Sequence, residues 1–186
     1  MKKISDSELA KNIEKWAEVD PKTAVMIPYT DRSAWNLLEK KKFLNLQNKQ
    51  SGQWYHADHP EKQAKEWFSS LELNQTEVLF VYGTGLGYTY EFLQKWVKEN
   101  PKRWVIFLED DLSVIYRLLE TSEGSKILHN PQMRLFYFQN VNDKESLFQR
   151  LVWEFVQSTI LVAATPFYFQ TKNEKFKELH HKIHFD

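Results

Sequence analysis

The 186-residue sequence predicts an α/β fold built on a parallel β-sheet with helices on both faces. Two observations support this prediction. From residue 77 onward, apolar runs typical of buried strands alternate with helical patterns, and four such repeats in a row indicate a parallel sheet. The first apolar run also ends in a glycine-rich turn where a helix begins. We therefore expect a Rossmann-like domain over residues 77–186, preceded by a small α+β extension over residues 1–76.

The first 76 residues contain several short predicted elements. A capping box at Ser5 to Glu8 begins a helix that should end near Asp20 and Pro21. Another helix is expected to begin at Asp58 to Glu61, with Pro60 in its first turn, where no hydrogen bond is lost. Three short strands are predicted to form a separate hairpin-like extension: Thr23 to Ile27, Phe43 to Gln47 and Gln53 to His56.

The repeats that follow predict the core of the domain. Four parallel strands are expected at residues 78–82, 104–108, 134–138 and 159–163, and the first of them should lie inside the sheet. The run from Val78 to Tyr82 is apolar throughout, as expected for a strand buried on both faces. The expected helices are Tyr88 to Glu99, one from Leu112 that stops near Gly124, one capped by Asn142 to Glu145, and Asn173 to His184.

Composition and charge exclude several classes of protein. The 25 basic and 25 acidic residues balance, so the chain lacks the basic surface that non-specific nucleic-acid binding requires. It has no cysteine, which rules out disulfides, thiolate metal sites and cysteine nucleophiles. No apolar segment is long enough for a membrane span, and no signal-peptide core is visible. We expect a cytoplasmic protein that binds neither nucleic acid nor membrane.

The glycine-rich turn is the main candidate for a binding site. Three of the five glycines lie in Gly83-Thr84-Gly85-Leu86-Gly87. In such turns the first glycine permits the tight bend, the second lets a ligand approach the backbone, and the N–H groups of the helix start favour an anion or a ribose edge. An acid about 20 residues further on grips ribose hydroxyls, and Glu109 ends the second strand near that distance.

These features predict a nucleotide-type ligand, although the glycines could instead serve only close packing of strand and helix. We favour ligand binding because the motif lies between a strand and a helix, as it must. The predicted ligand-binding residues are Gly83, Thr84, Gly85, Leu86, Gly87, Glu109 and Asp110. We assign no catalytic residue and no metal site.

Two kinds of ligand remain candidates, S-adenosylmethionine and a sugar nucleotide. The spacing of the turn resembles the first motif of S-adenosylmethionine-dependent methyltransferases, which carry an acid two residues before the first glycine, where this chain has Val81. A dinucleotide is disfavoured because Tyr88 stands where a third glycine belongs. The acids from Glu109 to Asp111 loosely resemble the triplet by which glycosyltransferases hold a metal and a sugar nucleotide. Capping of the next helix by one of them is the simpler explanation.

The histidines are weaker candidates. For His56 and His59 we favour a buried or capping role near the start of a helix over a contact with ligand. His180 and His184 lie one helical turn apart and could share a metal ion, but without the glutamate of the zinc-protease pattern we expect only adventitious affinity.

Several segments together resemble one family. Trp54 to Pro60, continuing to Ala64, resembles the "histidine, aspartate, proline, then helical alanine" element of motility accessory factors, which act in flagellin glycosylation. In that family a Gly-x-Gly-x-Gly-Tyr turn follows, here Gly83 to Tyr88, then an acid-ended strand and a strand that runs into proline and tyrosine, here Pro166 and Tyr168.

The resemblance implies a role for the chain. In the family, a glycosyltransferase core with a Gly-Pro-Ser signature lies C-terminal to a region like this one, and nothing in this chain matches that signature. The resemblance therefore implies an N-terminal Rossmann-like module that is non-catalytic by itself, has a pocket for a nucleotide-type ligand that could be vestigial, and adjoins a glycosyltransferase-like domain. The alternative is an S-adenosylmethionine-dependent methyltransferase.

Overall fold

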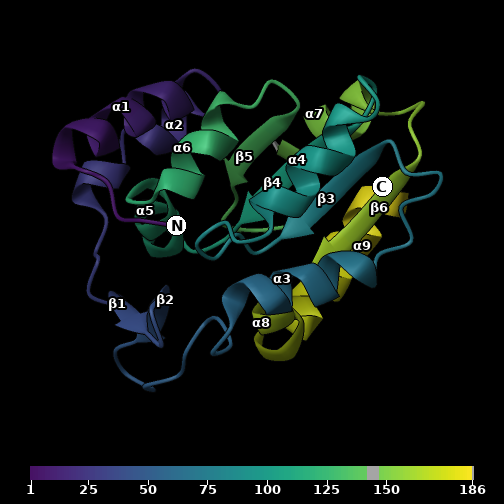
Figure 1. The fold of residues 1–186 in the computed structure, drawn as a ribbon. Helices are drawn as coiled ribbons and strands as arrows, with labels where there is room; N and C mark the ends of the chain where they lie inside the picture. Colours follow the sequence, from purple (N-terminus) through teal and green to yellow (C-terminus); the bar gives the residue numbers. More distant parts are fainter. Residues whose placement is uncertain (142–146, 186) are drawn as a thin grey trace.

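The computed structural model describes residues 1–141 and 147–185, and its centre is a four-stranded parallel sheet (Figure 1). The strands lie in the order β5-β4-β3-β6. The strand that leads into the glycine turn, β3, is therefore an interior one, as predicted. The sheet consists of β3 (Val78–Tyr82), β4 (Trp104–Glu109), β5 (Met133–Tyr137) and β6 (Ile160–Ala164). The chain is therefore an α/β protein with a Rossmann-like sheet.

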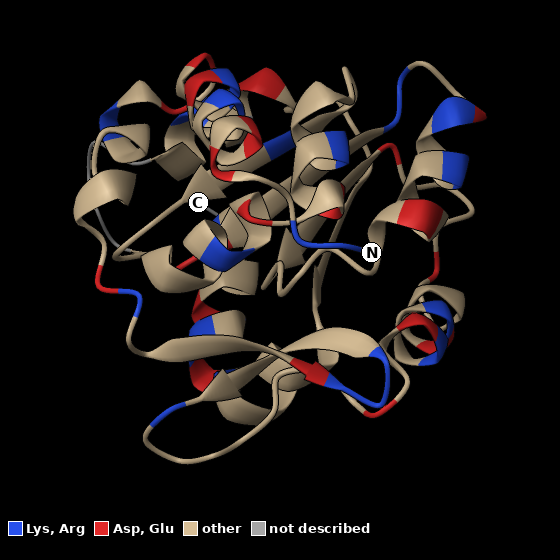
Figure 2. Cartoon of the chain, turned by 60° about the vertical axis from the view of Figure 1, so that its left-hand side comes forward, with Lys and Arg blue, Asp and Glu red and all other residues tan. Residues whose placement is uncertain are grey.

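Helices cover both faces of this sheet because alternate residues of each strand point to opposite sides. Phe80 and Tyr82 pack in one core cluster, and Leu79 and Val81 pack in the other. The helices of the C-terminal half are α4 (Tyr90–Lys98), α5 (Leu112–Leu119), α6 (Ser122–His129), α7 (Leu147–Glu154), α8 (Pro166–Thr171) and α9 (Asn173–Phe185). Basic and acidic residues are interspersed over the helices in the view of Figure 2.

The first 76 residues form helices and one antiparallel hairpin. The capping box at Ser5 is present, and α3 begins at Pro60, as expected. The elements are α1 (Asp6–Ala17), α2 (Pro21–Ala24), the 3₁₀ helix η1 (Ile27–Tyr29), β1 (Trp35–Lys40), β2 (Phe43–Asn48) and α3 (Pro60–Ser69).

Two of the three predicted N-terminal strands are wrong. The segment from Thr23 to Ile27 holds the end of α2, a turn at residues 25–26 and the start of η1. Asp20 caps α2 by accepting a hydrogen bond from the Thr23 N–H at 3.2 Å, and Pro21 occupies its first turn. Residues 53–56 form no strand but a short bridge to β2 at Gln47 and Trp54, with hydrogen bonds from the Asn48 N–H to the Gln53 carbonyl at 2.8 Å and from the Tyr55 N–H to the Leu46 carbonyl at 2.9 Å. The partner of β2 is instead β1, which precedes it in the chain.

The predicted end of the helix near Gly124 is also wrong. Thr121 caps a new helix, α6, and Gly124 lies inside it. A Cβ atom at Gly124 would lie 2.2 Å from the carbonyl oxygen of Leu118, so this glycine permits a close contact between α6 and the end of α5. The helix cap expected at 142–145 falls outside the described residues.

The N-terminal helix packs directly onto the sheet. The Trp16 side chain is fully buried, and its indole N–H donates to the Leu135 carbonyl in β5 at 2.8 Å. Asn12 is also buried and donates to the Leu119 carbonyl at 2.9 Å. The division of the chain at residue 76 stays a prediction, but side chains from before that residue contribute to both core clusters.

We expect Trp16→Ala to lower the free energy of unfolding by about 3–5 kcal/mol, because it opens a large cavity and leaves the Leu135 carbonyl without its donor. Urea denaturation followed by circular dichroism measures the change. Tyr29→Ala, at a side chain that is 89% exposed, is the matched control and should change stability by less than about 0.5 kcal/mol. Equal effects of the two substitutions would show that α1 is a detachable extension.

Candidate functional site

The glycine turn lies at the carboxyl edge of the sheet, between β3 and α4. Residues 83–88 are all buried. Gly83, Gly85 and Gly87 have φ angles of +88°, +51° and +81°, which residues with a Cβ atom rarely adopt. The turn therefore has the local conformation that the motif predicts, and its function depends on what fills the space around each glycine.

Glu109 is hydrogen-bonded to this turn. Its side chain is fully buried at the end of β4. One carboxylate oxygen accepts hydrogen bonds from the Thr84 N–H at 2.9 Å and the Thr84 hydroxyl at 3.1 Å. The other accepts from the N–H groups of Asp110 and Asp111, both at 3.0 Å, and from the Tyr168 hydroxyl. A carboxylate offers about four lone-pair sites, so these five donors leave it no capacity for ribose hydroxyls in this conformation.

The buried environment raises the pKa of the Glu109 carboxyl. Burial raises the pKa of the Glu109 carboxyl to about 7, against the opposing effect of the nearby Lys172 ammonium. Asp110 contributes to the rise, because two adjacent negative charges repel. Glu109 is thus an internal structural acceptor at the junction of β4, the turn and α8.

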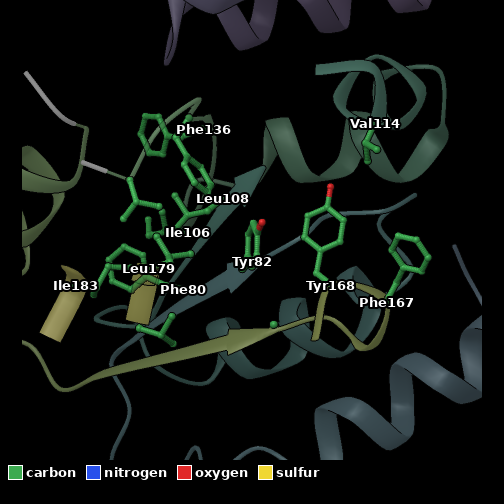
Figure 3. Close-up of a cluster of buried hydrophobic side chains, with 14 of the residues drawn as sticks. Phe80, Tyr82, Ile106, Leu108, Val114, Phe136, Phe167, Tyr168, Leu179 and Ile183 are labelled. Carbon is green, nitrogen blue, oxygen red and sulfur yellow. The ribbon is translucent and has the colours of Figure 1, made fainter. Parts of the chain in front are cut away.

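The space beside the first glycine is filled by the chain itself. A Cβ atom at Gly83 would lie 2.6 Å from the Thr165 hydroxyl oxygen and 2.6 Å from the Tyr168 ring. Figure 3 shows Tyr168 beside Tyr82, with its oxygen directed toward the helix that carries Val114. Gly83 therefore makes room for two side chains from the start of α8.

The second glycine is covered by two rings from the N-terminal region. A Cβ atom at Gly85 would lie 2.6 Å from Cε1 of His56 and 2.7 Å from Cε1 of Tyr55. His56 Nε2 accepts a hydrogen bond from the Leu86 N–H at 3.1 Å. A histidine ring thus lies against the glycine that a ligand would have to approach, and takes up one of the N–H groups of the turn.

This result corrects the sequence-based view of the histidines. His56 is only partly buried, lies beside Gly85 and does not cap a helix, so its expected buried or capping role is wrong. His59 precedes α3 at the cap position, yet its side chain makes no cap hydrogen bond and is exposed. His180 and His184 have ring centroids 4.4 Å apart, but the described residues contain no cluster of three or more metal-ligating side chains.

Asn45 fixes the position of His56. Its side-chain amide donates to the His56 carbonyl at 2.9 Å, and its side-chain oxygen accepts from the His56 N–H at 3.0 Å. Asn45 is 1% exposed and comes from β2. The hairpin therefore holds the His56 main chain by two hydrogen bonds. Sequence reasoning missed this residue, because a lone asparagine in a strand gives no signal of its distant partner.

His56 is uncharged in this position. Burial lowers the pKa of its imidazole from 6.5 to about 3. Since Nε2 accepts the hydrogen bond from Leu86, the neutral ring carries its proton on Nδ1. Protonation would place a second donor against the Leu86 N–H and a charge in an apolar site, so a charged His56 would open the contact.

The two acids that follow Glu109 have other hydrogen-bond partners. Asp110 accepts from Lys172 and Lys175, both at 2.6 Å, and from the Tyr82 hydroxyl at 3.0 Å. Burial raises the pKa of Asp110, but the two lysines outweigh it and lower the pKa overall. Asp111 caps α5 and accepts from the Trp35 indole at 2.8 Å. The three carboxylates thus have separate partners, and Asp111 has the capping role considered from the sequence.

Little volume remains at the turn. A cavity of about 20 Å³ lies between Tyr55, Thr84, Tyr88 and Thr165. Thr89 also lines it and buries a hydroxyl that has no hydrogen-bond partner in the described part of the chain. This volume suits about one water molecule, whereas pockets for small-molecule ligands measure roughly 300–1,000 Å³.

The structure therefore brings only some of the predicted residues together. Of the turn, Thr84 is hydrogen-bonded to Glu109, whereas Gly83 and Gly85 lie against side chains from α8 and from the N-terminal region. Asp110 turns toward α8 and α9. A Cβ atom at Gly87 would face Leu118, Glu123 and Ile127 at 3.1–3.2 Å, so this glycine serves packing against α5 and α6.

Replacement of Glu109 tests its structural role. We expect Glu109→Ala to lower the free energy of unfolding by at least about 3 kcal/mol without any ligand present, because five donors lose their acceptor. Thermal and urea unfolding measure the change. Glu72→Ala, at an exposed glutamate, is the control and should stay within about 0.5 kcal/mol. A neutral effect of Glu109→Ala would fit a ribose-binding acid better than a structural one.

The low pKa of His56 gives a pH prediction. The unfolded chain binds a proton at His56 below about pH 6.5, whereas the folded chain does so only near pH 3. His56 should therefore stabilise the fold above pH 6.5, and this contribution should fall by about 1.4 kcal/mol per pH unit as the pH drops.

Comparison of the wild type with His56→Gln isolates this contribution from the other five histidines. Glutamine can still accept from the Leu86 N–H but does not titrate, so the stability advantage of the wild type should shrink by about 2–3 kcal/mol between pH 6.5 and 4.5. Urea denaturation at several pH values measures both curves. Parallel curves would show that His56 has the same pKa in the folded and the unfolded chain.

Comparison with known proteins adds one structural relative. No family model and no curated protein sequence matches the chain. Its fold is similar to the solved structure of a Maf glycosyltransferase from Magnetospirillum magneticum AMB-1, with a TM-score of 0.62 and 12% sequence identity. The match covers 96% of this chain and 36% of the other. Within the described residues, every helix is too short or too polar to cross a membrane.

At this level of identity the likeness is one of fold. It agrees with the resemblance that the order of motifs indicates. The fold of this chain corresponds to about a third of the Maf glycosyltransferase.

Proposed function

We propose that this chain is a non-catalytic accessory module of a motility-accessory-factor-like, glycosyltransferase-associated protein. In this proposal, the module's glycine turn is a closed structural junction. The whole glycosyltransferase of the structural relative is much longer than this chain, which corresponds to 36% of it. The partner we expect is a glycosyltransferase-like domain. We also propose that the protein is cytoplasmic.

The observation that carries the proposal is the contact between His56 and Gly85. A ligand that used the turn would need the space that the His56 and Tyr55 rings occupy, and the N–H of Leu86 that His56 already accepts from. The cavity of about 20 Å³ beside them is at least tenfold smaller than ordinary ligand pockets. The turn therefore favours a structural role.

A second candidate function is an S-adenosylmethionine-dependent methyltransferase. The strand, glycine turn and acid-ended second strand favour it, since Thr84 of the turn and Glu109 lie together at the carboxyl edge of the sheet. Two observations weigh against it. Val81, where methyltransferases carry an acid, is fully buried in β3, and the oxygens of Glu109 are taken by internal donors.

Calorimetric titration separates the two functions. The purified chain is titrated with S-adenosylmethionine, S-adenosylhomocysteine and several sugar nucleotides, the last with and without Mn²⁺. We expect no binding tighter than about 1 mM, because binding would have to displace the Tyr55 and His56 rings. Micromolar binding of S-adenosylmethionine that Gly85→Val abolishes would contradict the proposal and favour the methyltransferase.

A cavity variant provides the matched positive control. His56→Gly removes the ring over Gly85 and should create a space that imidazole fills. We expect imidazole to raise the melting temperature of His56→Gly and to leave the wild type unchanged. An equal effect on both proteins would mean that the wild-type site is open.

A further inference from the structure

Two buried hydroxyl groups beside the glycine turn have no hydrogen-bond partner among residues 1–141 and 147–185. They are the Thr89 hydroxyl at the start of α4 and the Tyr55 hydroxyl from the N-terminal region. Thr89 is 6% exposed and Tyr55 is 3% exposed, so bulk solvent reaches neither group. Buried polar groups are normally hydrogen-bonded, because burial without a partner costs stability. Each hydroxyl therefore needs a partner that the described residues do not supply.

The backbone explains why the helix does not use the Thr89 hydroxyl. Thr89 is the N-cap residue of α4, and a capping side chain accepts from an N–H two or three residues further on when its own backbone is extended. Thr89 instead has φ −71° and ψ −17°, which is a helical conformation, and its side chain makes no cap hydrogen bond. The hydroxyl is therefore available to a group outside the helix.

The Tyr55 hydroxyl keeps its proton and needs an acceptor. Burial raises the pKa of the phenol well above its usual value, and the nearby Glu109 carboxylate adds to the rise. Thr165 and the Gly85 main chain lie close enough to oppose part of this rise in pKa, but neither is in hydrogen-bonding geometry with the hydroxyl. The Tyr55 ring stacks on Phe167, with ring centroids 4.4 Å apart. The hydroxyl oxygen is therefore held in place.

Tyr55 and Thr89 line the same small cavity, whose volume is about 20 Å³. An internal water needs roughly 10–15 Å³ and about two to four polar partners, so the cavity suits one water and no larger ligand. Thr165 supplies a further hydroxyl to the lining. This hydroxyl donates to the Tyr82 carbonyl at 3.3 Å, so the lone pairs of its oxygen remain to accept from a water.

We propose that a single long-lived water molecule occupies this cavity, where it accepts from the Tyr55 hydroxyl and bridges it to the Thr89 hydroxyl. The water joins the segment that covers Gly85 to the helix that follows the glycine turn. It adds a polar contact across the closed junction to the hydrogen bond between His56 and the Leu86 N–H. The inference rests on the proposed function, because it takes the turn to be closed without a ligand.

Magnetic relaxation dispersion of oxygen-17 in water tests the site in solution, because it counts the water molecules that stay bound for longer than the protein takes to rotate. Thr89→Val keeps the shape of the side chain and removes the hydroxyl, and Tyr55→Phe does the same at the other partner. We expect each variant to hold one long-lived water fewer than the wild type. Thr159→Val, at an exposed threonine, is the matched control and should leave the count unchanged.

The sign of the change in melting temperature is a second measurement. With a water bound to the hydroxyl, Thr89→Val removes a hydrogen bond and should lower the melting temperature by about 2–4 °C. A hydroxyl without any partner would give a rise, because valine is then the better buried side chain. Thr89→Val and Tyr55→Phe together should lower the melting temperature by less than the sum of their separate effects, because either substitution alone releases the shared water.

Three results would overturn the proposal. The wild type and both variants could hold equal numbers of long-lived waters, Thr89→Val could raise the melting temperature, or a crystal structure could show both hydroxyls bonded directly to protein groups. Should Thr89→Val fail to fold, Tyr55→Phe and the crystal structure decide the question. The water count is made without any ligand, whereas the proposed function fails if the wild type binds a nucleotide-type ligand in the calorimeter, so the two failures are distinguishable.

Discussion

The architecture at the carboxyl edge of the sheet depends on the buried carboxylate of Glu109. An ionised group inside a protein is stable only where donors replace its water. Here the donors come from the glycine turn, from the residues that begin α5, and from Tyr168 of α8. One side chain thereby fixes the relative positions of three segments that are far apart in the sequence.

The position of Glu109 determines how the turn can be used. The carboxylate holds the turn on one side, and the rings of Tyr55 and His56 cover Gly85 on another. The hairpin of β1 and β2 positions this cover, since Asn45 fixes the main chain of His56 and His56 accepts from Leu86. The N-terminal region is thus a structural part of the site.

Sequence patterns predicted the elements whose signals are local. The parallel strands and the interior place of β3 follow from apolar runs that alternate with helical patterns, and α1 follows from its capping box. The errors lie where local signals compete or where partners are distant. Thr23 to Ile27 is rich in β-branched residues, but Asp20 and Pro21 cap a helix there. β1 contains charged and polar residues and has no clear alternation, so only its partner β2 was expected.

The limit of sequence-based prediction is clearest at the glycine turn. A glycine that admits a ligand and a glycine that admits a neighbouring side chain need the same backbone conformation, so the motif from Gly83 to Gly87 cannot distinguish them. The difference lies in His56, which is 29 residues before Gly85 and reaches it only through the hairpin. The conformation of a glycine-rich turn is therefore evidence of close approach, and the identity of the approaching group has to come from the tertiary structure.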